Sequence, residues 1–159
     1  MSFLRFLMLL SLIVWLGGLI FFPVVAQMAF SMLPSRHLAG LVVGRSLSVL
    51  HWMGIISGAV FLASSVLYSR FESGTTNILA GRHLLICLML ALTLISQFAI
   101  IPRMDTLRAA IPGEIDSVSP DNPARMQFDA LHAWSTRLEG GVLLLGLVVA
   151  YLTASSFQR

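Results

Sequence analysis

The residues that could do chemistry in this chain are two histidines, one glutamate and a few polar neighbours. His132, Ser135 and Glu139 are separated by three, four and seven residues, so they share one face of a helix. His51 lies in an otherwise apolar stretch and could face them. Such a group of ionisable side chains could bind a ligand or mark a pathway through a membrane. The alternative without chemistry is that Glu139 pairs with an arginine at the membrane boundary.

A second group of residues offers soft metal ligands. Met28 and Met32 are four residues apart at the end of the first apolar stretch, and His51 could lie near them. Thioether and imidazole ligands suit copper in its reduced state. A haem held by His51 and His132 is a weaker alternative, because these two residues are expected to differ in depth by about one and a half helical turns. Methionines in an apolar chain mostly fill gaps in packing, and we expect no cofactor.

The sequence lacks the motifs of common catalytic centres. It contains no Gly-x-Ser-x-Gly, no His-Glu-x-x-His, no phosphate-binding loop and no dinucleotide fingerprint. Cys87 is the only cysteine, so the chain has no intramolecular disulfide and no cysteine-based zinc site. These observations predict a protein without enzymatic activity.

The polar residues lie in or beside four stretches of sequence that contain no Asp, Glu, Lys or Arg. A bilayer core of ~30 Å needs ~20 helical residues, and each stretch is long enough to cross it. The stretches are 6–35, 46–69, 83–102 and 140–158. In lipid every backbone polar group needs an internal partner, which favours helices. The sequence therefore predicts an all-α, integral membrane four-helix bundle.

The expected boundaries make one domain of residues 1–159. The predicted spans are about 4–30, 46–69, 83–102 and 137–157, with a polar loop at 103–122 and a turn at 73–77. Pro102 is expected to close the third span. Asn122 is expected to cap the fourth helix, with Pro123 at its first position. That helix, and a second helix starting near Ser35, are longer than the membrane is thick. Helices two and four should therefore extend beyond the bilayer on the loop side.

Helix geometry predicts which polar residues share a depth. Spans two and four run in the same direction, and an offset of about 88 residues relates their levels. His51 then lies level with Glu139, and Arg103 or Arg137 could complete a polar cluster at the loop-side boundary.

Small residues mark the expected helix contacts, because they let backbones approach closely. Gly54 and Gly58 on the second span could serve the bundle or join two copies of the chain. The other expected contact residues are Gly17 and Gly18 on span one and Gly141 and Gly146 on span four. His37 and His83 lie beside arginines at span ends and are expected at the surface.

The charges point to a membrane and away from nucleic acid. All ten basic residues are arginine, and they lie singly at span ends and in loops, where they can anchor at lipid headgroups. An even number of spans places both termini on one side. Arg5 and the tight loop with Arg70 and Arg82 favour the cytoplasm for that side, in a bacterial inner membrane.

The N-terminus also has features of a secretory signal. Arg5 precedes a long apolar run that ends near the small residue Ala26. The run is longer than a typical signal, so we expect it to stay as the first span.

Several segments together resemble the transmembrane protein 205-like family. They are Trp-Leu-Gly-Gly-Leu-Ile-Phe-Phe at 15–22, Leu-Pro-Ser-Arg-His-Leu-Ala-Gly at 33–40 with His51 eleven residues later, Ile-Pro-Arg-Met-Asp at 101–105 and Phe-Asp-Ala-Leu-His-Ala-Trp-Ser at 128–135. The resemblance implies a four-span membrane protein with an uncharacterised domain and no assigned reaction. Its pattern positions here are His51, Pro102, Arg103, His132 and Ser135. The first segment is also similar to copper-resistance D type membrane proteins.

The sequence leads to two functional hypotheses. The first is a non-enzymatic accessory or membrane-homeostasis component whose partners are membrane lipids, other proteins or a second copy. The alternative is a protein that binds or transports a copper-like metal ion or a small solute through the polar residues named above.

Overall fold

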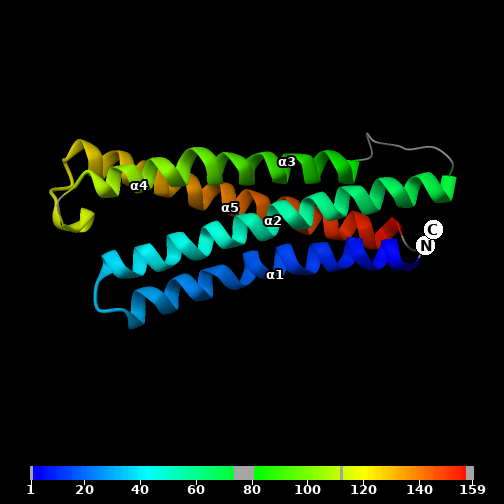
Figure 1. Ribbon diagram of the computed structural model, residues 1–159, viewed down its shortest axis with the longest axis horizontal. Helices are drawn as coiled ribbons and strands as arrows, with labels where there is room; N and C mark the ends of the chain where they lie inside the picture. Colours follow the sequence, from blue (N-terminus) through cyan, green and yellow to red (C-terminus); the bar gives the residue numbers. More distant parts are fainter. Residues whose placement is uncertain (1, 74–80, 112, 157–159) are drawn as a thin grey trace.

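The fold is all-α. A computed structural model describes residues 2–73, 81–111 and 113–156, and Figure 1 shows the path of the chain. The elements are α1 (Ser2–Met32), α2 (Arg36–Ser73), α3 (Gly81–Ile95), the π-helical turn η1 (Ser96–Ile100), α4 (Ile101–Ala109), the 3₁₀ turn η2 (Ile115–Ser117) and α5 (Pro123–Ser156). Residues 74–77 of the predicted turn and the predicted end of the fourth span at 157 lie outside the described residues.

Four helical segments are long and apolar enough to cross a membrane. They are α1, α2, the continuous run from α3 through α4, and α5. Their outward surface is also apolar: Ile13, Leu144 and Tyr151 are each about two-thirds exposed or more. A surface of this kind needs lipid around it rather than water. The predicted membrane four-helix bundle is therefore confirmed, and the chain is a multi-pass membrane protein.

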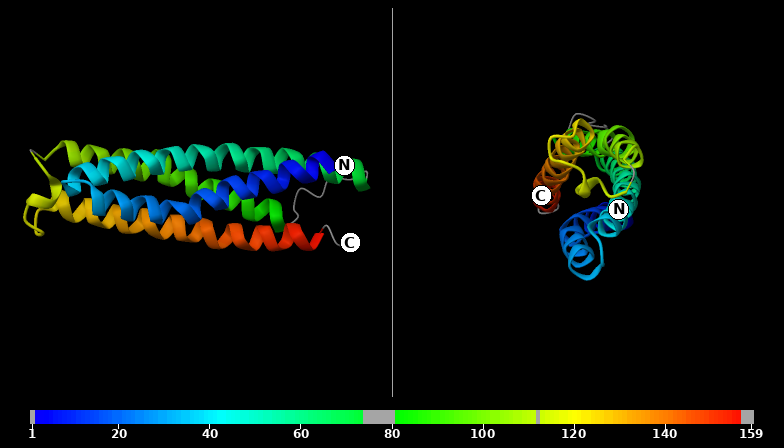
Figure 2. Two further views of the ribbon diagram at one scale, coloured as in Figure 1. Left: turned by 90° about the horizontal axis from the view of Figure 1, so that it is seen from below. Right: turned by 90° about the vertical axis from the view of Figure 1, so that its left-hand side faces the viewer.

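The helices form a ring. α1 packs on α2, α2 on α3, α3 on α5, and α5 on α1. Figure 2 shows the resulting elongated bundle from the side and from its loop end. The start of α1 and the end of α5 lie at the same end of the bundle, as an even number of spans requires (Figure 1).

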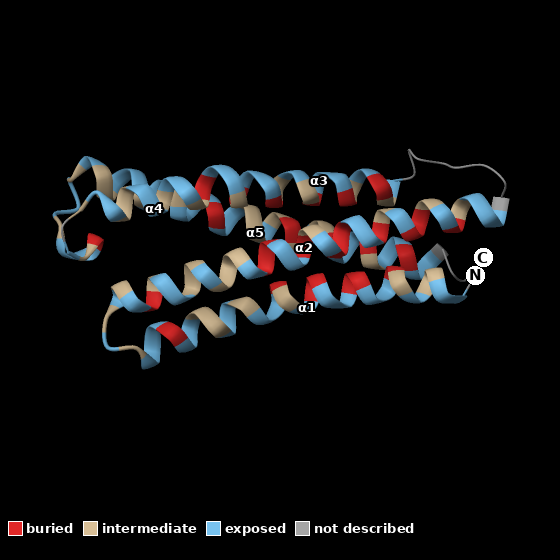
Figure 3. Cartoon of the chain, viewed as in Figure 1, coloured by how far each residue is buried: buried red, intermediate tan, exposed pale blue. Residues whose placement is uncertain are grey.

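The core lies on the faces that the helices turn toward one another (Figure 3). Trp15 is fully buried and packs against Gly54 and Gly58 of α2. A Cβ atom at position 54 would lie 2.4 Å from Trp15 Nε1, and one at position 58 would lie 2.7 Å from Leu90 Cδ2. The predicted role of this glycine pair in the bundle is confirmed. Because Trp15 and Leu90 occupy its face, the pair is not free to join two copies of the chain.

The remaining predicted contact glycines divide into two groups. Gly18 faces Leu50 and Gly146 faces Leu16, each so closely that a Cβ would lie about 2.6 Å or less from a side-chain carbon. Gly141 lies near Leu92 at an ordinary contact distance. Gly17, in contrast, is exposed with nothing within 4 Å of a Cβ, so its predicted packing role is wrong.

The helix of the third span does not end at Pro102. The helix continues beyond it as α4 to Ala109, so the polar loop is shorter than 103–122. A proline lacks an N–H and its ring clashes with the carbonyl four residues earlier, which usually stops or bends a helix. Here the wider turn η1 comes directly before, and the N–H of Ile101 bonds to the carbonyl of Ser96. Pro102 then occupies the first turn of α4, where a missing N–H costs nothing.

The starts of α2 and α5 agree with the sequence. The N–H of Ala124 donates to Asn122 Oδ1 at 2.9 Å, so the predicted cap of α5 is confirmed. Both helices start well before their charge-free parts at 46 and 140, and their first turns extend toward the loop end.

Candidate functional site

Three polar side chains from different parts of the sequence meet inside the bundle. His51 Nε2 lies 2.6 Å from Glu139 Oε1, and His51 Nδ1 lies 2.9 Å from Gln97 Oε1. The His51 side chain is 1% exposed and that of Glu139 is 14% exposed. We call His51, Gln97 and Glu139 the polar triad. The structure thus brings together His51 and Glu139, the two residues that the depth argument placed at one level.

The polar triad connects three elements of the ring. His51 comes from α2, Gln97 from η1 and Glu139 from α5. α2 and α5 lie on opposite sides of the ring, so the bond between His51 and Glu139 crosses its interior. Beside it, the rings of Trp52 and Phe98 meet edge to face with centroids 6.0 Å apart. These contacts fix α2 against the π-helical turn at the depth of the triad.

The π-helical turn explains how Gln97 reaches His51. Such a turn inserts one residue into a helix and re-aims the side chains within it, and it is common at functional sites. Pro102 accounts for its place in the chain, because the wide turn precedes the proline and relieves its clash with the helix. Gln97 was missed in the sequence analysis. A signal existed, since Gln97 lies five residues before Pro102 and His51 lies five residues after Ser46, at matching distances from the loop-side ends of two antiparallel spans.

Both ring nitrogens of His51 are within hydrogen-bond distance of a partner. Nδ1 faces the carbonyl oxygen of Gln97, and Nε2 faces Glu139 Oε1. A carboxyl group bonded to a histidine is less costly within a membrane than an isolated charge.

Two members of the triad, His51 and Gln97, lie within charge-free segments, and Glu139 directly precedes a third. His51 is six residues from Arg45, and Gln97 is six residues from Arg103. At 1.5 Å per residue, each separation is about 9 Å along the helix. A histidine and a carboxylate at this depth form the candidate site of the molecule.

The other predicted members of the cluster lie elsewhere. Ser135 is buried one turn before Glu139 on α5. His132 and Arg103 are exposed, and Arg137 stacks on Trp134 with its guanidinium carbon 5.4 Å from the ring centre. In the part of the chain that the structure describes, neither Arg103 nor Arg137 has an ion pair with Glu139. The histidine, not an arginine, is the partner of the carboxylate.

The predicted metal ligands are not brought together. Met28 and Met32 are 51% and 75% exposed, while His51 is buried and bonded to the triad. Within residues 2–73, 81–111 and 113–156, no group of three His, Cys, Asp or Glu residues is placed to hold a metal ion. His132, exposed on α5, does not face His51 as a second haem ligand would.

The family of the chain follows from a comparison with protein-family models. The model described as "Domain of unknown function (DUF4149)" matches residues 10–112, more than half of the chain. The chain belongs to the DUF4149 family. The matched segment contains His51 and Gln97 and ends before Glu139. No curated protein and no solved structure matched the chain in the same comparisons.

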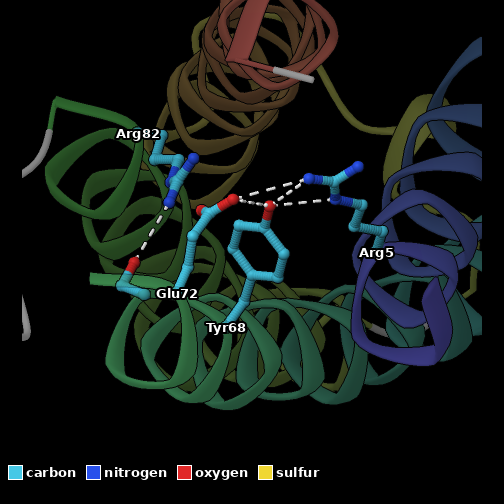
Figure 4. Close-up of polar contacts among 5 residues, drawn as sticks. Arg5, Tyr68, Glu72 and Arg82 are labelled. Atoms are coloured by element: carbon cyan, nitrogen blue, oxygen red, sulfur yellow. Dashed lines mark hydrogen bonds and ion pairs between the residues drawn. The ribbon is translucent and has the colours of Figure 1, made fainter. Parts of the chain in front are cut away.

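A second polar group, which the sequence analysis missed, lies at the end of the bundle where α1 starts and α2 ends (Figure 4). The hydroxyl of Tyr68 donates to Glu72 Oε1 at 2.6 Å and accepts from Arg5 Nε at 3.0 Å. Arg5 Nη2 also lies 3.6 Å from Glu72 Oε1. These bonds tie the start of α1 to the end of α2, although Arg5 itself precedes the matched segment.

Two further bonds at this end connect α3 with α2. Arg82 Nη2 donates to Ser69 Oγ at 3.3 Å, and His83 Nε2 is hydrogen-bonded to Ser65 Oγ at 2.7 Å. His83 is 3% exposed, so its predicted surface position is wrong. A histidine next to an arginine at a span end can point inward, because the two side chains lie about 100° apart around the helix. His37, the other histidine in that prediction, is half-buried.

Proposed function

We propose that this DUF4149 protein is a non-enzymatic, multi-pass component of a bacterial inner membrane, with both termini in the cytoplasm. In this proposal it acts through its helical bundle, as an accessory or membrane-homeostasis protein. The observation that carries the proposal is that both ring nitrogens of His51 are hydrogen-bonded to side chains of the same chain.

The reasoning starts from the two ring nitrogens of His51. One is bonded to Gln97 and the other to Glu139, and the side chain is buried. A histidine that acts as a base, a nucleophile or a metal ligand needs one nitrogen free for its reactant. With both nitrogens engaged, the bonds of His51 serve to hold α2, η1 and α5 in one arrangement. The likeness to the transmembrane protein 205-like family supports the same proposal, since that family implies four spans and no assigned reaction.

A second candidate function is binding or transport of a small solute. Its support is an ionisable His51–Glu139 pair inside the helical bundle, since such residues often mark pathways through membrane proteins. A ligand would have to displace either Gln97 or Glu139 from His51. The copper version has less support, because Met28 and Met32 lie on the outer surface.

Elemental analysis and absorption spectroscopy of purified protein distinguish the two candidates. The protein is prepared without a histidine tag, as wild type and as His51→Ala. We expect no stoichiometric metal and no cofactor absorption in either sample. One bound metal ion or chromophore per chain in the wild type, lost in His51→Ala, would contradict the leading proposal and support the second. Turnover or flux of a solute by reconstituted wild type, abolished in Glu139→Gln, would do the same.

A further inference from the structure

The loop end of the bundle contains a cavity that is separate from the polar triad. It has a volume of about 660 Å³ and lies between the first turns of α2 and the last turns of α4. Figure 1 shows where these two segments lie in the bundle. The polar residues lining it are His37, Arg45, Ser48, Asp105 and Arg108. None of the residues of α4 is buried, so this end of the bundle is much less tightly packed than its core.

The charges around this loop-side cavity favour an anion. Arg45 and Arg108 contribute two positive charges and Asp105 one negative charge. The nearest ion pair joins Arg108 Nη1 and Asp105 Oδ1 at 3.4 Å. Arg45 has no acidic partner in the described ranges 2–73, 81–111 and 113–156, so its charge is not compensated by the chain. An anion in the cavity could bind to the guanidinium of Arg45, and to that of Arg108, which also pairs with Asp105.

The Arg108 side chain is held in place by a neighbouring helix. Its guanidinium carbon lies 5.1 Å from the ring centre of Phe128 on α5. His37 Nδ1 is buried, and no hydrogen-bond partner for it is found among the residues that the structure describes. A buried polar atom without a partner costs free energy unless a ligand or water satisfies it. His37 lines the same cavity, but its buried Nδ1 atom is not exposed there, so the inference does not depend on it.

The position of the cavity indicates that the anion belongs to a lipid. Arg45 directly precedes the charge-free part of α2, and Arg108 follows Pro102 on α4, so the cavity lies at the expected level of the headgroups. Leu41 and Val42 line it beside the charged residues and are partly exposed. A basic pocket with an apolar wall between membrane helices matches the phosphate and the glycerol end of an anionic lipid.

We infer that the loop-side cavity binds the phosphate group of an anionic membrane lipid through Arg45 and Arg108. This site shares no residue with the polar triad. It therefore stands or falls independently of the proposed function.

Native mass spectrometry of the detergent-solubilised protein tests the inference. The probes are phosphatidylglycerol, phosphatidylcholine and inorganic phosphate, added separately at equal concentrations. We expect retention of phosphatidylglycerol in preference to phosphatidylcholine. Arg45→Gln should weaken phosphatidylglycerol binding about fivefold, which corresponds to the loss of one basic residue from a lipid contact. The matched control is Arg103→Gln, which removes an exposed arginine at the same end outside the cavity and should leave binding unchanged.

A substitution that changes size but not charge gives a second test of the cavity. Gly44 lines the cavity, and nothing lies within 4 Å of a Cβ at this position. Gly44→Leu should fill part of the cavity and reduce phosphatidylglycerol binding. Gly17→Leu, at a glycine with equally open surroundings on α1, should not. Thermal melting of each variant shows that it is folded.

Three outcomes would overturn the inference. Equal weakening by Arg45→Gln and Arg103→Gln would show general charge attraction rather than a site. Unchanged binding in folded Arg45→Gln and Gly44→Leu proteins would place the lipid elsewhere. Binding of inorganic phosphate without preference for phosphatidylglycerol would identify a soluble anion in place of a lipid.

Discussion

At the scale of single residues, the polar triad is the feature that organises the interior of the bundle. The sequence could pair His51 with Glu139, because regular helix geometry places the two residues at the same depth. Gln97 could not be added by that argument alone, because its direction depends on the π-helical turn before Pro102. For His83 and Tyr68, too, the sequence could not predict the direction of the side chain. Their depth follows from the sequence, but their inward direction depends on how α2 and α3 are rotated in the bundle.

The triad predicts an unequal response to single and double substitutions. His51→Leu removes the partner of a carboxylate within the membrane and should destabilise the protein by about 3 kcal/mol. In the double variant His51→Leu, Glu139→Leu, no carboxylate remains, so the loss of stability should be smaller than in His51→Leu alone. Unfolding in detergent measures both. His132→Leu, at an exposed histidine on α5, is the control and should change stability little. Equal or additive losses in the single and double variants would show that His51 and Glu139 do not depend on each other.

At the scale of elements, close approach of helices at glycine determines how α1 and α2 pack. The sequence identified Gly54 and Gly58 because small residues four apart are typical of membrane helix contacts. It could not separate Gly18, which packs, from Gly17, which does not, because neighbouring residues differ only in helix rotation. The continuation of the helix past Pro102 was missed for a related reason. A proline predicts interrupted hydrogen bonding, but not whether a π-helical turn restores the helix.

This packing gives a prediction within one helix. Gly54→Ala places a methyl group against the buried ring of Trp15 and should destabilise the bundle by about 2 kcal/mol. Gly44→Ala, also on α2, meets nothing within 4 Å and should stabilise the helix by up to about 1 kcal/mol. Thermal melting in detergent compares the two variants with the wild type. A Gly54→Ala protein as stable as Gly44→Ala would show that α1 and α2 do not meet at Trp15.

At the scale of the whole molecule, the charge pattern and the apolar outer surface define a protein that crosses a membrane four times. The four spans and the common end of α1 and α5 were predictable, because bilayer thickness sets helix length and an even number of crossings returns the chain to its first side. The polar groups of the molecule lie at three levels along the bundle. Arg5, Tyr68 and Glu72 tie helices at one end, the polar triad lies inside, and the loop-side cavity lies at the other end.

Cysteine labelling in sealed vesicles tests the four crossings most directly. Cys87 is replaced by alanine, and single cysteines are introduced as Ser2→Cys, Arg159→Cys, Ser35→Cys or Ser119→Cys. A membrane-impermeant maleimide should label positions 35 and 119 from one face and positions 2 and 159 from the opposite face. With both termini in the cytoplasm, positions 2 and 159 react only after permeabilisation of right-side-out vesicles. Labelling of positions 2 and 159 from opposite faces, or of all four from one face, would contradict a chain that crosses the membrane four times.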